Sequence, residues 1–258
     1  MKKFDRMLAI LGGFTAFLAF VTSPVAAETG TLKMRFVYAG DPPQAEPLNV
    51  AQNGEFCGKH DLKNEELVVD PETKGIKNIV VYIDSRRSDI PEQTPVNNTH
   101  ILANKNCRFE PHVVLAQTGD TLKVTNPDPV GHNANLNFFR NTAQNLMIPA
   151  SQEKSVSLEE AEPAPIPVDC NIHPWMRSYV VVLDHPFADV TGTNGEITIE
   201  GLPVGEELTF RVWHEKGRID EVVINGDEEK WRRGRFELEI KAGMNDLGTV
   251  TVPAKAFD

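Results

Sequence analysis

The stretch Cys170-Asn171-Ile172-His173-Pro174-Trp175-Met176, followed by the apolar run Tyr179–Leu183, places three metal-binding side chains in one short loop beside a strand. A thiolate, an imidazole and a thioether occur there at C-x2-H-x2-M spacing. A second imidazole comes from Gly131-His132-Asn133, which follows a predicted strand over 121–125 and its turn. These donors predict a metal site with four ligands: His132, Cys170, His173 and Met176.

The identity of the metal follows from the donor set. Two imidazoles and a thiolate in a trigonal plane, with a long axial thioether, define a type 1 copper site. Such donors suit both Cu(I) and Cu(II), so the ion changes oxidation state with little movement of its ligands. We therefore expect one type 1 copper ion that carries single electrons. No substrate is bound and no bond is made, so the chain is not expected to be an enzyme.

The N-terminus has the layout of a secretory signal. Three basic residues, at positions 2, 3 and 6, precede an apolar run over 7–21, and Val25-Ala26-Ala27 supplies the small residues that signal peptidase needs. We expect a signal peptide over 1–27, cleaved after Ala27, and a periplasmic or secreted mature chain. The alternative is an uncleaved anchor, although the run is short for a membrane span. No second long apolar run follows, so no membrane span is expected in the mature chain.

Export bears on the three cysteines, Cys57, Cys107 and Cys170. Cysteines usually pair in an oxidising compartment, and an odd thiol there needs an explanation such as a metal bond. The surroundings of Cys170 favour the metal, which leaves Cys57 and Cys107 as the natural disulfide pair. Closing that loop would stabilise the fold by roughly 4 kcal/mol in the chain-entropy model.

Strand patterns dominate the chain. Two continuous runs rich in β-branched residues, Ile79–Ile83 and Tyr179–Leu183, suit central strands, and turn-forming clusters such as Asn126-Pro127-Asp128-Pro129 separate the strands. Alternating apolar and polar residues, the period of a half-buried strand, occur at Leu32–Tyr38, Leu122/Val124, Val156/Leu158, Ile197/Ile199, Leu208–Val212 and Phe236–Ile240. Many short strands between turns predict an all-β fold, a Greek-key β-sandwich with N-terminal and C-terminal β extensions.

A boundary between domains is expected near His185-Pro186-Phe187. The sandwich with its N-terminal extension would then cover 28–186, and a C-terminal β extension would cover 187–258. That extension either folds onto the same sandwich or forms a separate small β module.

The charge balance narrows the range of partners. The chain has 26 Lys and Arg against 37 Asp and Glu, a formal net charge of −11. Phosphate backbones and anionic lipid repel such a surface, which argues against binding to nucleic acid or to a membrane surface. A basic redox partner would be attracted.

The ligand loop and the following strand resemble those of the amicyanin family, small cupredoxins associated with methylamine oxidation. The stretch Thr118–Asn126, ending in His132-Asn133, resembles the strand and turn that deliver the first ligand in that family. The resemblance covers about Pro111 to Leu183. It implies that His132, Cys170 and His173 bind copper in a plane and that Met176 lies on the axis.

The resemblance also implies redox protein partners, a quinoprotein dehydrogenase as donor and a c-type cytochrome as acceptor. Electrons would pass through an exposed edge of His173. Asn133 either bonds across to the Cys170 loop and holds the ligand loops in register, or is a turn residue. Trp175 either forms an apolar docking patch beside His173 or packs in the core.

Two other functions stay open on the sequence alone. One is copper storage or delivery without redox turnover, although no Met-rich or His-rich tract occurs. The other is an interaction module with a non-redox role, because Gly195–His214 resembles carboxypeptidase regulatory-like β modules. An oxidase would need a second metal site, and no His-x-His pair suggests one. We expect the remaining histidines to be structural: His60, His100, His112, His185 and His214.

Overall fold

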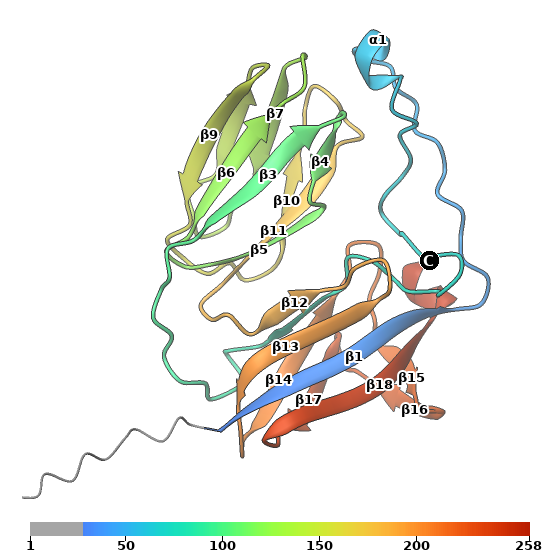
Figure 1. The fold of residues 1–258 in the computed structure, drawn as a ribbon, viewed down its shortest axis with the longest axis vertical. Helices are drawn as coiled ribbons and strands as arrows, with labels where there is room; N and C mark the ends of the chain where they lie inside the picture. The colour runs from blue at the N-terminus through green and yellow to red at the C-terminus, as the bar shows by residue number, and fades with distance from the viewer. Residues whose placement is uncertain (1–27) are drawn as a thin grey trace, which may run out of the picture.

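The computed structural model describes residues 28–258, and its regular structure is nearly all β (Figure 1). The expected signal peptide, 1–27, lies outside the described residues. The predicted all-β sandwich class is confirmed, but the strands form two sandwiches that lie one above the other in Figure 1. In the described part of the chain, neither of the short helices has the length and apolar character that crossing a bilayer requires.

The first sandwich, here called the inserted sandwich, is built from residues 99–183 and contains every expected metal ligand. Its two sheets have the strand orders β5-β11-β10-β7-β8 and β4-β3-β6-β9. Its strands are β3 (Thr99–Lys105), β4 (Arg108–Glu110), β5 (Val113–Gln117), β6 (Thr121–Asn126), β7 (His132–Leu136), β8 (Gln144–Ile148), β9 (Gln152–Ser157), β10 (Ile166–Asp169) and β11 (Arg177–Leu183).

The second sandwich, here called the terminal sandwich, combines the two ends of the chain. Its sheets have the orders β13-β1-β18-β15-β16 and β12-β2-β14-β17. Its elements are β1 (Thr29–Ala39), β2 (Val80–Ile83), β12 (Ala188–Val190), β13 (Glu196–Pro203), β14 (Glu207–Trp213), β15 (Glu221–Ile224), β16 (Asp227–Lys230), β17 (Arg235–Glu239), β18 (Gly243–Pro253) and the 3-10 helix η1 (Ala254–Phe257).

This pairing divides the chain differently from the expected boundaries, which grouped 28–98 with the ligand loops. β1 lies antiparallel to β13 and parallel to β18, so the N-terminal and C-terminal segments form one sheet. The chain leaves the inserted sandwich after β11, which ends at Leu183. The N-terminal segment was assigned to the other half because a half-buried strand does not reveal its partner in the sequence.

The two sandwiches stack through one sheet of each. Val80 and Tyr82 on β2 pack against Val113 and Val181 from the inserted sandwich. The other side of β2 faces the core of its own sandwich with Val81 and Ile83. Both faces of this strand are therefore buried, which explains the continuous apolar run that the sequence showed.

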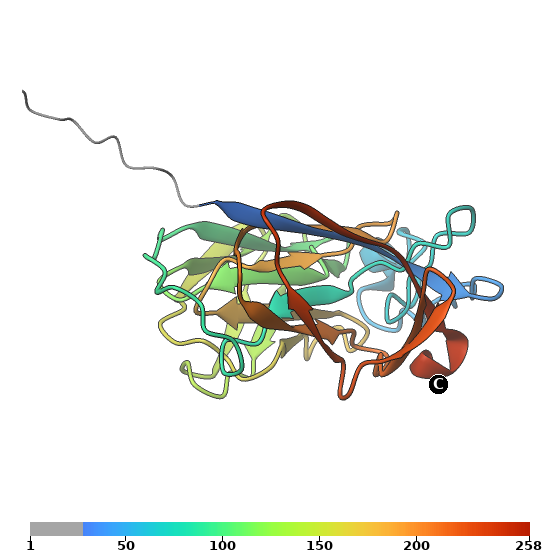
Figure 2. The same ribbon diagram turned by 90° about the horizontal axis from the view of Figure 1, so that it is seen from below.

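A long segment between β1 and β2, residues 40–78, is here called the strap. Figures 1 and 2 show it projecting from the end of β1 along the flank of the molecule, with the short helix α1 (Gly54–Cys57) at its tip. A disulfide joins Cys57 on α1 to Cys107 in the turn between β3 and β4. This confirms the pairing predicted from the cysteine count, and it attaches the strap to the inserted sandwich.

Candidate metal centre

The ligand loop is the connection of a β-hairpin. β10 pairs antiparallel with β11 on one side, where Asp169 lies opposite Arg177, and with β7 on the other side. The loop closes through hydrogen bonds from the Cys170 N–H to the Met176 carbonyl (3.2 Å) and from the Met176 N–H to the His173 carbonyl (2.9 Å). Because β7 begins at His132, this pairing brings the first ligand next to the loop.

The structure brings three of the four predicted ligands together in the interior. The donor atoms of His132, Cys170 and His173 all lie within 4.8 Å of one another, and the side chains are buried. The two Nδ1 atoms are 2.9 Å apart, and Cys170 Sγ lies 3.7 Å from Nδ1 of His173. The fourth, Met176, is 1% exposed and packs in the same hydrophobic cluster as Cys170.

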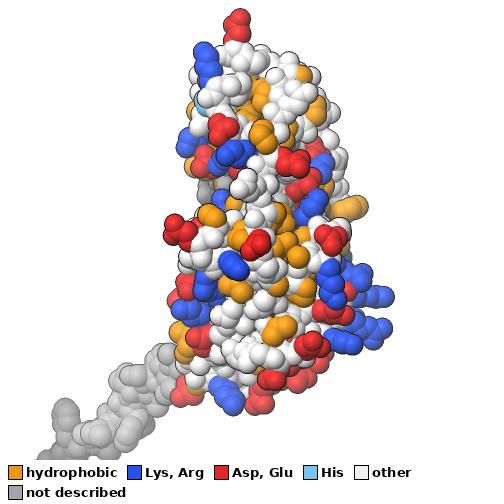
Figure 3. Space-filling model, turned by 90° about the vertical axis from the view of Figure 1, so that its right-hand side faces the viewer, with side chains coloured by type: hydrophobic (Ala, Val, Ile, Leu, Met, Phe, Trp, Pro, Cys, Tyr) orange, Lys and Arg blue, Asp and Glu red, His pale blue; other side chains and the backbone are white. Residues whose placement is uncertain are grey.

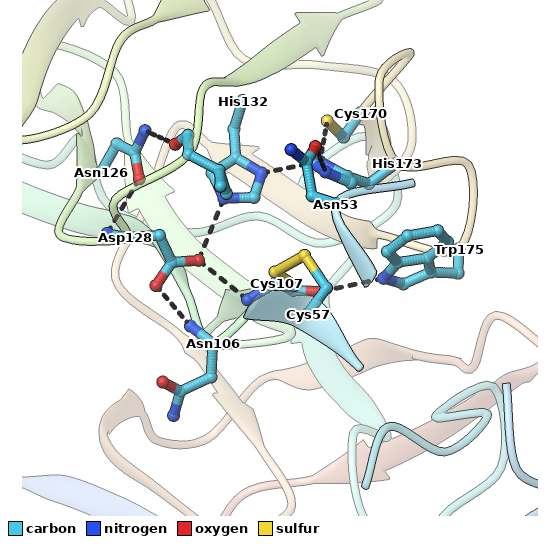
Figure 4. Close-up of a disulfide and its surroundings, with 11 residues drawn as sticks. Asn53, Cys57, Asn106, Cys107, Asn126, Asp128, His132, Cys170, His173 and Trp175 are labelled. Carbon is cyan, nitrogen blue, oxygen red and sulfur yellow. Dashed lines mark hydrogen bonds and ion pairs between the residues drawn. A yellow bond between two sulfur atoms is a disulfide. The ribbon is translucent and has the colours of Figure 1, made fainter. Parts of the chain in front are cut away.

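The outer nitrogen of each imidazole has an oxygen partner (Figure 4). Nε2 of His132 lies 3.0 Å from a carboxylate oxygen of Asp128, and Nε2 of His173 lies 2.9 Å from Oδ1 of Asn53. Both oxygens are acceptors, so each Nε2 carries the hydrogen and each Nδ1 carries a lone pair. Two lone pairs thus face each other beside a sulfur atom, and they repel unless a cation lies between them.

Burial keeps both imidazoles neutral near pH 7. Desolvation lowers the pKa of His173 to about 4, and the neighbouring His132 acts in the same direction. Desolvation also lowers the pKa of His132, with partial compensation by the Asp128 carboxylate. Metal ions bind neutral imidazole, so both side chains are in the protonation state that metal binding requires.

Asn133 connects the two ligand segments, as one of its two sequence interpretations predicted. Its Oδ1 accepts hydrogen bonds from the N–H groups of Asn171 (2.8 Å) and Ile172 (3.3 Å), and it lies 3.5 Å from Cys170 Sγ. Its Nδ2 donates to Asn145 on β8 at 2.7 Å. These bonds hold the ligand loop in register with β7.

The expected exposed edge of His173 is wrong. The imidazole is 0% exposed, because the tip of the strap lies over it and Asn53 occupies its outer nitrogen. This cover has no local signal in the sequence, since Asn53 lies 120 residues before its partner.

Trp175 lies between its two predicted environments. Its indole N–H donates to the Cys107 carbonyl at 3.0 Å, and its ring centroid lies 5.2 Å from that of His173. The side chain is half-buried between the ligand loop and the disulfide-linked turn, so it is neither a freely exposed patch nor a core residue.

Asp128 is the most connected residue that the sequence prediction missed. Besides His132, its carboxylate accepts the N–H groups of Asn106 (2.7 Å) and Cys107 (2.8 Å). It therefore links the predicted ligand His132 to the disulfide. Asp128 lies four residues before His132 in a turn-forming stretch, and an aspartate in that position is also typical of a plain turn.

Four of the other histidines have partners typical of structural residues. The partners are Asp120 for His100, Glu215 for His112, the Ile83 carbonyl for His185 and the Lys216 N–H for His214. His60 stacks edge-on against Phe56, and its buried Nε2 has no partner.

Comparison with known proteins gives matches among solved structures only. The chain is similar to a Cu(I) form of a methionine-to-glutamine variant of amicyanin, at 22% identity and a TM-score of 0.30, over 37% of this chain and 98% of that one. A reduced tryptophan-to-tyrosine variant of amicyanin matches at 22% identity and a TM-score of 0.30, over 40% of this chain and 97% of that one.

The copper-containing nitrite reductase from Thermus scotoductus SA-01 matches at 15% identity and a TM-score of 0.30, over 38% of this chain and 25% of that one. No protein-family model and no curated protein matches the chain. The chain is thus similar to these copper proteins over 37–40% of its length.

Proposed function

We propose that this chain is a type 1 copper protein that carries single electrons between redox partners outside the cytoplasm. The observation that carries the proposal is the pair of imidazole lone pairs on His132 and His173, aimed at each other at 2.9 Å beside the Cys170 sulfur. These three donor atoms suit a cation that binds two nitrogen ligands and one soft sulfur ligand.

The donor chemistry fits copper. His132, Cys170 and His173 would hold the ion, and the buried Met176 would supply a weak thioether donor. When bound, copper supplies a one-electron couple between Cu(I) and Cu(II). The oxygen atoms of Asn53, Asp128 and Asn133 accept hydrogen bonds from the ligand segments and fix them from outside, so the donor positions would change little between the two states.

The acidic surface and the predicted signal peptide agree with a periplasmic or secreted carrier. Donor and acceptor would be redox proteins, with a quinoprotein dehydrogenase and a c-type cytochrome as the candidates that the amicyanin resemblance implies. The carrier itself makes and breaks no covalent bond of a substrate, so we do not propose an enzyme.

One observation favours a second candidate, copper storage without redox turnover. His173 is fully buried beneath a strap that a disulfide attaches to the inserted sandwich. Such a cover would slow the loss of a bound ion as well as contact with a large partner.

Spectroscopy of residues 28–258 loaded with copper separates these functions. A carrier should bind one copper per chain, show an intense visible thiolate-to-copper band, give the EPR signal of a type 1 site and have a reversible reduction potential. Tight but colourless Cu(I) binding without a reversible couple would identify storage. Failure to bind copper at one equivalent would overturn both candidates.

A further inference from the structure

The outer part of the strap is packed loosely against the rest of the molecule. Over 41–60, a range that the structure describes in full, Cys57 is the only buried residue. A cavity of about 700 Å³ lies between the strap and the inserted sandwich, with Leu48 and Leu62 on its strap side and Pro174 on the ligand loop. Figure 3 looks onto this flank, where charged, polar and apolar side chains are interspersed. Burial of apolar surface therefore contributes little to holding this part of the strap in place.

Contacts at the tip of the strap hold it over the candidate metal centre (Figure 4). One is the disulfide between Cys57 and Cys107, and both of these residues are 0% exposed. Another is the hydrogen bond that Nε2 of His173 donates to Oδ1 of Asn53 at 2.9 Å. The indole N–H of Trp175 holds the same turn from the ligand loop, because it donates to the Cys107 carbonyl at 3.0 Å. The covalent attachment thus lies at the point where the strap covers His173.

The disulfide and the hydrogen bond differ in how well they keep the cover closed. A hydrogen bond contributes modestly, since water satisfies both partners once they separate. The disulfide excludes the open conformations of the strap, because Cys57 cannot leave Cys107 while the S–S bond is intact. With two thiols instead, the tip would keep only its noncovalent contacts, while the ends of the strap stay attached to β1 and β2. The tip could then move away from His173 without unfolding either sandwich.

We propose that oxidation of Cys57 and Cys107 fixes the strap over His173, and that the site receives its ion beforehand, while both sulfurs are thiols. In the oxidation the two S–H bonds break and one S–S bond forms. The oxidant is a protein disulfide, which takes up the two protons and two electrons and becomes two thiols. The order of loading rests on the proposed copper function, whereas the covering of His173 does not depend on the metal. Because both sulfurs of the finished disulfide are buried, thiols in solution cannot attack it while the strap is closed.

The cover is tested on metal-free residues 28–258 with diethyl pyrocarbonate, which acylates accessible neutral imidazoles, and peptide mass spectrometry reports the rate for each histidine. In the disulfide form His173 should react slowly, because its ring is 0% exposed. In the double variant Cys57→Ser, Cys107→Ser it should react at least tenfold faster. His100 is the internal standard and should react equally in both proteins, because its side chain is 28% exposed at the end of β3 remote from the disulfide.

Leu122→Ala separates movement of the strap from a general loss of stability. Leu122 is 0% exposed in the core of the inserted sandwich, so this change destabilises the fold around the ligands and leaves the disulfide in place. His173 of the Leu122→Ala protein should react as slowly as in the parent. An unchanged rate in the double variant, or an equal rise in Leu122→Ala, would overturn the proposal that the disulfide keeps His173 covered.

The order of loading is tested by offering Cu(I), as its coloured bicinchoninate complex, to the metal-free proteins under anaerobic conditions. The double variant should remove Cu(I) from the complex at least tenfold faster than the disulfide form, and both proteins should finally bind one equivalent. Equal rates of uptake would overturn the order of loading. If neither protein takes up Cu(I), the copper proposal fails, while the modification of His173 still decides whether the disulfide keeps the site covered.

Discussion

Asn53 on the strap accepts a hydrogen bond of 2.9 Å from Nε2 of His173, a residue 120 positions later in the chain. Asn53 adopts a left-handed backbone conformation, with φ of 48° and ψ of 38°, immediately before α1. A residue outside the inserted sandwich thus contacts a predicted metal ligand. The contact also decides the tautomer of His173, because it places the ring hydrogen on the outer nitrogen.

Replacement of Asn53 separates this hydrogen bond from its backbone conformation. Asn53→Gly removes the side chain but tolerates the left-handed φ, so it should lower the free energy of unfolding by about 1 kcal/mol. Asn53→Ala should cost about 1–2 kcal/mol more, because alanine disfavours that conformation. Copper affinity should fall roughly tenfold or more in both. Urea unfolding and competition with a copper chelator measure the two effects, and parental affinity in Asn53→Gly would contradict a positioning role.

Asp128→Ala tests the link between His132 and the disulfide-bonded turn. It removes the acceptor for two backbone N–H groups and for the His132 ring, so the free energy of unfolding should fall by about 3 kcal/mol. Asp128→Asn keeps the shape and one acceptor oxygen and should lie between Ala and the parent. Equal stability of all three proteins in urea would show that the carboxylate is not needed.

Cys170→Ser tests the identity of the thiolate. The visible band should disappear, while circular dichroism should show the β fold retained. The matched control replaces Cys57 and Cys107 by Ser, and it should keep the band because those sulfurs form a disulfide. Persistence of the band in Cys170→Ser would require another sulfur ligand.

Loss of the disulfide should destabilise the chain by about 4 kcal/mol, since the bond closes a loop with a sequence separation of 50 residues. The double Cys57→Ser, Cys107→Ser protein measures this in urea. Dithiothreitol should lower the parent to the same stability and leave the double variant unchanged. A parent that is indifferent to the reductant after unfolding and refolding would argue against the bond.

The lowered pKa of the buried His214 leads us to expect a loss of stability in acid. Burial lowers its pKa from 6.5 to about 4, so the unfolded chain binds the proton first. This stabilising contribution is complete above pH 6.5 and is lost as the pH falls to about 4. The total is about 3 kcal/mol at 1.36 kcal/mol per pKa unit. His214→Gln cannot titrate and should flatten the dependence of unfolding free energy on pH in that window. The same slope in both proteins would exclude His214 as its source.

Strand positions could be predicted well because the patterns are local. The predicted strand Leu32–Tyr38 lies within β1, and the predicted strand Leu208–Val212 lies within β14. The two-faced burial of β2 and β11 was predicted only in part. Their continuous apolar runs indicated central strands, but the second covering layer is a neighbouring sandwich, which a local pattern cannot identify.

The grouping of His132, Cys170 and His173 could also be predicted, because two of them lie in one loop and His132 begins the adjacent strand. Their outer contacts could not. Asn53 and the Cys107 carbonyl reach the site from other segments, and an asparagine or a backbone carbonyl carries no distinctive sequence signal. The burial of His173 was missed for this reason.

Because β1 pairs with β18, the terminal sandwich cannot be completed before the end of the chain has been synthesised. Phe36 lies beside Val250, so the strand from which the strap extends acquires this neighbour only when the last strand has been made. All strands of the inserted sandwich come from the contiguous stretch 99–183, which a ribosome delivers earlier. Because the strands that carry the two imidazoles and the thiol precede β18 in the chain, we expect these side chains to come together before the base of the strap is anchored. We expect an incoming ion to meet the least obstruction during that interval.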